Sequence, residues 1–173
     1  MKKILQTAMI GLLVFLVACD SETKKTDEST TTDTTAAMDD NTTTATGNVM
    51  NGAGLPMRPD QEVPVNNSPA SGSADVTYNK DTKMLTYTLN WSGLTDKPTM
   101  AHIHGTAARG ANAGVKHDLT NVLKKETSGS FTDSVKVDGT TIKEDSLLSG
   151  FYYFNIHTPA NPGGEIRGQI EFK

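Results

Sequence analysis

Two histidines separated by a single residue are the side chains of this 173-residue chain whose types and spacing best suit chemistry. In an extended segment alternate side chains point to opposite faces, so His102 and His104 would share one face. The chain has only two more histidines, His117 and His157, and both follow in its C-terminal part. The chemistry open to this set depends on whether the four rings meet.

Two uses of such a set stay open from the sequence. Three or four imidazole nitrogens that converge on one point at about 2.0–2.1 Å would bind a transition metal, and without a thiolate they suit copper or zinc. Alternation puts His102, His104 and His157 on like faces of strands, with Asn155 on the face of His157. The other use is a polar network, in which partly buried histidines donate to backbone carbonyls and Asn155 takes part.

The elements that must position these side chains are strands. Apolar residues recur at every second place through much of residues 51–173, and turn residues interrupt them at 79–82 and 159–164. Thr141 and Glu144, with a glycine stop at position 150, predict one short helix or turn. The sequence therefore predicts an all-β antiparallel sandwich or barrel. We expect strands over 74–78, 85–91, 100–104, 115–122, 129–137, 151–158 and 166–172.

The N-terminal residues have the features of an exported lipoprotein. Lys2 and Lys3 precede an apolar run over 4–17, which is too short for a membrane-spanning helix but suits a secretory signal peptide. The run leads into Leu-Val-Ala-Cys, which resembles a bacterial lipobox and contains the chain's only cysteine, Cys19. We predict a lipoprotein signal peptide over 1–18, a lipid anchor at Cys19 and a location in the bacterial cell envelope. An ordinary signal peptide with an incidental cysteine is the alternative.

Residues 19–50 have the composition of a disordered linker. The segment is rich in Thr, Asp and Ala, and seven acidic residues stand against two lysines. Such a composition cannot bury enough apolar surface to offset its ordering entropy. The remaining residues, 51–173, are expected to form one domain that is nearly neutral. A nucleic-acid-binding domain would need a clustered basic face, so nucleic acid is excluded as a partner.

Three segments of the expected domain carry a family resemblance. They resemble the CHRD domain, a module named after chordin and also found in bacterial secreted proteins. The resemblance covers about residues 51–173, and its motifs are specific in combination. They are Gln61-Glu62-Val63-Pro64, Ala101-His102-Ile103-His104-Gly105, and Tyr153-Phe154-Asn155-Ile156-His157-Thr158 with the following Asn161-Pro162-Gly163-Gly164-Glu165-Ile166-Arg167-Gly168.

The resemblance implies an immunoglobulin-like β-barrel with faint similarity to copper/zinc superoxide dismutases. The His-x-His strand resembles the copper strand of those enzymes, in which later histidines complete the site. His117 lies outside the matching motifs. A working dismutase is not favoured, because the chain lacks a second metal set rich in His and Asp. It also has no cysteine left for the disulfide that those enzymes use.

Three charged residues of the matching motifs, Glu62, Glu165 and Arg167, are interpreted as a salt bridge or loop brace between the first and last strands. A ligand site is the alternative. The sequence contains no nucleophile elbow, phosphate loop or zinc-protease helix.

The sequence thus leads to three hypotheses of function. The first is a non-enzymatic, lipid-anchored envelope domain that binds an unknown extracytoplasmic partner. The second is an envelope lipoprotein that binds copper or zinc through the histidines. The third, a dismutase-like redox enzyme, has the least support. The separation of the histidine rings decides whether the second hypothesis holds.

Overall fold

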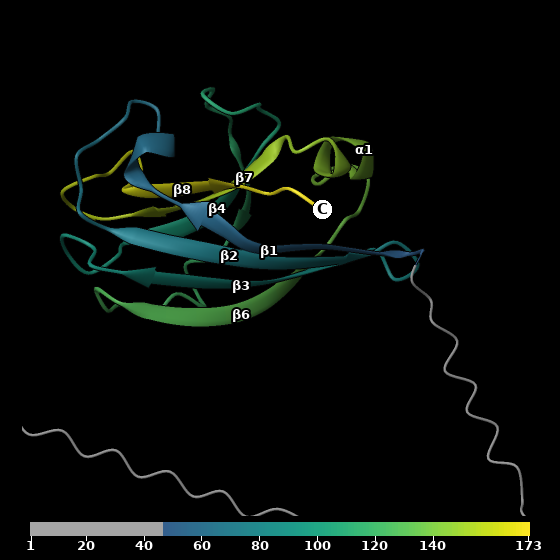
Figure 1. The fold of residues 1–173 in the computed structure, drawn as a ribbon, viewed down its shortest axis with the longest axis horizontal. Helices are drawn as coiled ribbons and strands as arrows, with labels where there is room; N and C mark the ends of the chain where they lie inside the picture. The colour runs from purple at the N-terminus through teal and green to yellow at the C-terminus, as the bar shows by residue number, and fades with distance from the viewer. Residues whose placement is uncertain (1–46) are drawn as a thin grey trace, which may run out of the picture. The chain divides into compact units, whose positions relative to one another are not determined.

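The computed structural model describes residues 47–173, which form two antiparallel sheets of four strands each. Figure 1 shows the two sheets as stacked layers. The predicted antiparallel β-sandwich with one short helix is confirmed. The first sheet has the order β1-β2-β3-β6, with β1 (Val49–Met57), β2 (Ser71–Asn79), β3 (Met84–Ser92) and β6 (Gly129–Lys136). The second has the order β5-β4-β7-β8, with β4 (Met100–Gly105), β5 (Val115–Asp118), β7 (Tyr152–His157) and β8 (Ile166–Gln169).

Strand β1 was not expected from the sequence. It begins at Val49, inside the segment assigned to the linker, and pairs with β2. Its register shifts between Gly52 and Leu55, so the alternation of side chains is broken there. The predicted signal peptide, the lipidation of Cys19 and the linker as far as residue 46 lie outside the described residues. Within residues 47–173, no helix has the length and apolar character needed to cross a bilayer.

The hydrophobic core fills the space between the sheets, as the alternation predicts. Strands β2 and β3 form a hairpin in which every second side chain is buried. Strand β7 contributes Tyr152, Phe154 and Ile156 from the opposite layer, each at most 1% exposed. The rings of Tyr87 and Phe154 lie 5.1 Å apart, centroid to centroid, and join the two sheets. This burial orients the alternate residues of β7 toward the outer side of the second sheet.

The outer side of the second sheet is also covered. All six residues of β7 and all four of β8 are buried, which a single apolar face does not explain. The 3-10 turn η1 (Pro59–Gln61) contacts β8 and lies beside it in Figure 1. Residues 107–113 and 158–165 form further hydrogen bonds to this side. A buried layer of polar side chains therefore lies between the second sheet and its loops. Helix α1 (Glu144–Leu148) precedes β7 and lies outside this layer.

Candidate metal centre

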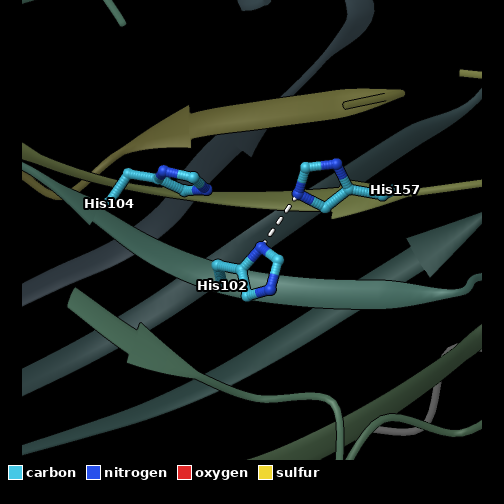
Figure 2. Close-up of side chains that lie close together, drawn as sticks. All are labelled: His102, His104 and His157. Atoms are coloured by element: carbon cyan, nitrogen blue, oxygen red, sulfur yellow. Dashed lines mark hydrogen bonds between the residues drawn. The ribbon is translucent and has the colours of Figure 1, made fainter. Parts of the chain in front are cut away.

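The pairing of β4 with β7 brings three histidines together. His102 lies opposite Asn155 in the register, so His157, two residues further along β7, is a diagonal neighbour of His102 on the same face. One ring nitrogen from each of His102, His104 and His157 lies within 4.8 Å of the others. Figure 2 shows the three rings facing one another, with His102 Nδ1 hydrogen-bonded to His157 Nε2 at 3.0 Å. The structure thus brings together three of the four histidines whose meeting the sequence left open.

Backbone carbonyls fix the protonation of two of the rings. His104 Nδ1 donates to the carbonyl oxygen of Ala113, and His157 Nδ1 donates to that of Pro162, both at 2.9 Å. A carbonyl only accepts, so each Nδ1 carries the hydrogen and each Nε2 of the neutral ring carries a lone pair. His104 Nε2 is buried and has no hydrogen-bond partner within the described part of the chain. Imidazoles held this way present their lone pairs as metal ligands do.

The third ring, His102, has a carboxylate near its second nitrogen. Because His157 Nε2 accepts, His102 Nδ1 carries the hydrogen in their shared bond. Its Nε2 lies 3.9 Å from Asp118 Oδ1 on the neighbouring strand β5. If Nδ1 bound a metal, its proton would have to move to Nε2, and a small shift would let Nε2–H donate to the Asp118 carboxylate. Backbone carbonyls thus orient His104 and His157, while the Asp118 carboxylate lies near His102 at a distance longer than a hydrogen bond.

Burial keeps the three rings neutral. The pKa of His102, of His104 and of His157 is lowered from its usual value, in each case chiefly because the ring is withdrawn from water. The neighbouring His157 lowers the pKa of His102 further. Neutral imidazole is the form that binds a metal ion, so all three side chains are available as ligands at neutral pH.

The spacing of the nitrogens fits a first-row metal ion. Nitrogens at about 2.0–2.1 Å from a tetrahedral ion lie about 3.4 Å from one another. In the structure the separations run from 3.0 Å, between His102 and His157, up to 4.8 Å at most. Shifts of about 1 Å in side-chain position would therefore suffice, with no rearrangement of the strands. Three neutral nitrogens with no thiolate suit copper or zinc.

The fourth histidine, His117, does not join the group. It lies on β5 opposite Ile103 in the register, and directly paired residues share a face. Ile103 points into the core, so the side chain of His117 emerges on the side of the second sheet away from the cluster. The group of possible metal ligands found in the described residues contains His102, His104 and His157 without it.

Glu165 joins loops to the last strand, and its partners do not lie on the first strand as the predicted brace would require. Its carboxylate accepts from the hydroxyls of Thr158 and Ser68, and from both the amide and the hydroxyl of Thr95. Although burial alone would raise its pKa, these donors together hold the pKa of Glu165 below its usual value. Glu165 thus ties three loops to the start of β8.

Arg167 is the other anchor of the polar layer and is only 1% exposed. It donates through Nη2 to the carbonyl oxygen of Ala111 at 2.9 Å, and its guanidinium carbon lies 3.4 Å from the centroid of the Tyr153 ring. The ring of His104 stacks on Tyr153 at 5.0 Å with an interplanar angle of 4°. Arg167 therefore supports a metal-ligand candidate through an aromatic ring.

Glu62 lies in the same layer but does not form the expected salt bridge. The ion pairs of residues 47–173 do not include Glu62, Glu165 or Arg167. Glu62 is 4% exposed, and burial raises the pKa of its carboxyl to about 7 despite the attraction of Arg167. The carboxyl packs against Gly164, whose φ of +131° and lack of a side chain leave room for it.

Comparison with known families identifies the chain. The CHRD domain family matches residues 54–170, more than half of the 173-residue chain. The protein belongs to the CHRD family. Every histidine of the cluster and every charged residue of the polar layer falls inside the matched part of the CHRD domain. Comparisons with curated proteins and with solved structures give no match.

A hollow opens beside the polar layer of the CHRD domain. It has a volume of about 420 Å³ and lies between η1 and β8, where Glu62 and Arg167 form part of its wall. Within the described residues, the ring nitrogens of the cluster form no hydrogen bond to Glu62 or Arg167. The hollow and the histidine cluster are therefore two distinct sites in the same polar layer.

Some residues of the site were not predicted from the sequence. Ala113 and Pro162 act through backbone carbonyls, which carry no side-chain signal. Tyr153 was placed on the face of His157, but its stacking between β4 and β8 depends on the register. Asp118 could have been proposed from the sequence, because it lies in the predicted strand 115–122. In the structure this strand pairs with the strand that carries His102 and His104.

Proposed function

We propose that this CHRD protein is a non-enzymatic, lipid-anchored protein of the bacterial cell envelope whose β-domain binds copper or zinc through His102, His104 and His157. One observation carries the metal assignment. Three neutral imidazoles converge within 4.8 Å, and a backbone carbonyl holds the second nitrogen of two of them, His104 and His157. His104 Nε2 is buried near the Asn155 amide without a hydrogen bond of standard geometry, so its lone pair is free to bind an ion.

The supporting geometry resembles that of metal sites in which outer groups orient the ligands. Such groups fix the ring orientation and make the ligating nitrogen more basic. Here the two carbonyls come from residues 113 and 162, in loops on either side of β7 in sequence, and the carboxylate comes from β5. Two of the three rings are therefore already oriented by carbonyls before an ion arrives, whereas His102 must move its proton from Nδ1 to Nε2.

The metal assignment predicts saturable binding of one ion per chain. The full chain, purified in detergent, would be titrated with Cu²⁺ and with Zn²⁺ by calorimetry. The double variant His102→Ala/His104→Ala should lose binding, because it removes two of three ligands. The matched control His117→Ala should bind as the wild type does, since His117 lies outside the group.

Two results would contradict the metal assignment: no saturable binding by the wild type, or tight binding that survives the double change. If copper binds, a superoxide-consumption assay on the loaded protein separates a binding protein from a dismutase-like enzyme. Rapid consumption that the double variant lacks would overturn the non-enzymatic part of the proposal.

The anchor is supported by the N-terminal motif alone. In a bacterial host, the wild-type chain should incorporate labelled palmitate and sediment with membranes. Cys19→Ser should do neither, because Cys19 is the chain's only cysteine and the lipid would be attached to it. Labelled, membrane-bound Cys19→Ser protein would rule out this anchor, and Ser21→Ala provides a matched control nearby.

A further inference from the structure

Met100 lies on the same face as the histidine cluster. It is the first residue of β4, and alternation places it with His102 and His104, while Ala101 and Ile103 are fully buried on the core side. In the register of β4 and β7, Met100 is directly opposite His157. Residues in such a pair have Cβ atoms about 4.5–5.5 Å apart, so the thioether of Met100 can reach the space above the His157 ring.

The exposure of Met100 sets it apart from the other methionines of residues 47–173. Met57 is fully buried in the core, and Met50 packs against the core. Met84 lies at the start of β3 in the other sheet. Met100 is 38% exposed, so it fills no gap in the core. Other apolar residues are also exposed, so what distinguishes Met100 is its place opposite His157 on the face of the cluster.

Resting on the proposed metal function, we propose that Met100 supplies a fourth, thioether donor and thereby makes the cluster a copper site that favours Cu⁺. Thioethers are soft ligands that select Cu⁺ over harder ions, whereas zinc gains little from them. Three neutral imidazoles and one thioether form an uncharged donor set, which suits a monovalent ion. The three unbranched side-chain bonds of methionine allow the sulfur to approach without movement of the backbone.

Met100 is more exposed than the two imidazoles nearest to it in the register. His157 is 6% exposed and His102 is 9% exposed, whereas Met100 is 38% exposed. Its thioether is therefore in contact with solvent at the end of the cluster next to His157. A thioether is neutral at every physiological pH, so it accepts the ion without releasing a proton.

The test compares Met100→Leu with the wild type as full chains. Leucine matches methionine in volume and keeps the strand apolar. Cu⁺ affinity would be measured without oxygen by competition with a chromophoric Cu⁺ chelator, and Zn²⁺ affinity by calorimetry. We expect Met100→Leu to weaken Cu⁺ binding by about tenfold or more and to change Zn²⁺ affinity by less than about threefold. Copper-edge X-ray absorption should show one sulfur neighbour in the wild type and none in Met100→Leu. The control Met84→Leu should match the wild type.

The outcomes separate this inference from the proposed function. If the wild type binds copper through nitrogen only, and Met100→Leu keeps the same Cu⁺ affinity, the thioether is overturned while the three-histidine site stands. If the wild type prefers Zn²⁺ to Cu⁺, the assignment to copper is overturned. If it binds neither ion, both proposals fall. Loss of Cu⁺ affinity and of the sulfur signal in Met100→Leu alone supports the inference.

Discussion

The outer faces of the two sheets have similar strand patterns but opposite environments. On the first sheet, Thr88 and Thr132 form a hydrogen bond of 2.7 Å between exposed hydroxyls. On the second sheet, the corresponding outward positions hold His157 and Arg167, which are 6% and 1% exposed. Polar side chains in water need no partners from the protein, whereas buried ones must be paired or carry a cost. The stability of the CHRD domain should therefore depend much more on the polar residues of the second sheet than on those of the first.

The difference in burial comes from the loops that cover the outer face of the second sheet. Glu165 binds the loops that contain Ser68, Thr95 and Thr158, and Arg167 binds the loop at Ala111. These loops exclude water from the histidines and lower their pKa. The exposed first sheet has no such cover in the described residues over Thr88 and Thr132. The described residues thus form a covered polar layer on the second sheet, where the histidine cluster lies.

Among substitutions of outward-facing residues, we expect the largest loss of unfolding free energy at Arg167. Arg167→Ala removes the hydrogen bond to Ala111 and the contact with Tyr153, and it takes a positive charge from the vicinity of buried Glu62. We expect the free energy of unfolding to fall by about 3–5 kcal/mol. Thr88→Ala, the control on the exposed face, should cost less than about 1 kcal/mol. Urea denaturation at pH 7 measures both, and equal losses would contradict the contrast.

A smaller, pH-dependent effect should come from Glu62. Its folded-state pKa of about 7 exceeds the ordinary value of 4.5, so the neutral carboxyl stabilises the fold below pH 4.5. That contribution is lost as the pH rises to about 7. Glu62→Gln stays neutral throughout. Relative to the wild type, it should therefore gain about 2 kcal/mol of unfolding free energy between pH 5 and pH 8.

The control for Glu62 is Glu165→Gln, whose effect should be of the opposite kind. The pKa of Glu165 is lowered, so its ionised form already contributes fully at pH 5 and at pH 8. This variant should be destabilised by a similar amount at both values. Urea denaturation of the three proteins at the two pH values provides the comparison. A pH-independent difference between Glu62→Gln and the wild type would mean that Glu62 is ionised at pH 5.

Much of the fold could be predicted because the strands are half-buried in a regular way. Strands β2, β3 and β7 alternate apolar and polar residues, and their predicted faces agree with the structure. Strand β1 was not predicted because its alternation is broken. The segment contains glycines at 52 and 54, and its register shifts between Gly52 and Leu55. The predicted strand over 115–122 ends earlier, at Asp118, where its side chain accepts from the Thr120 amide in a turn.

The candidate site could be predicted in part. Alternation gives the faces of His102, His104 and His157, but only the register of β4 with β7 makes them neighbours. The sequence does not specify which strands pair, and for that reason His117 was grouped with residues on the opposite side of its sheet. The loops that bury the layer follow no periodic pattern, so neither the burial of Arg167 nor the raised pKa of Glu62 was foreseeable.

The pairing of β4 with β7 also has a consequence for the order of folding. His102 and His157 are 55 residues apart in sequence, and the chain between them forms β5, then β6 in the other sheet, then α1. Such non-local pairing closes a long loop and is slow to form. The complete set of ligands therefore exists only once β4 and β7 have paired within the second sheet. A metal ion would bind the finished domain far better than its folding intermediates and would slow its unfolding.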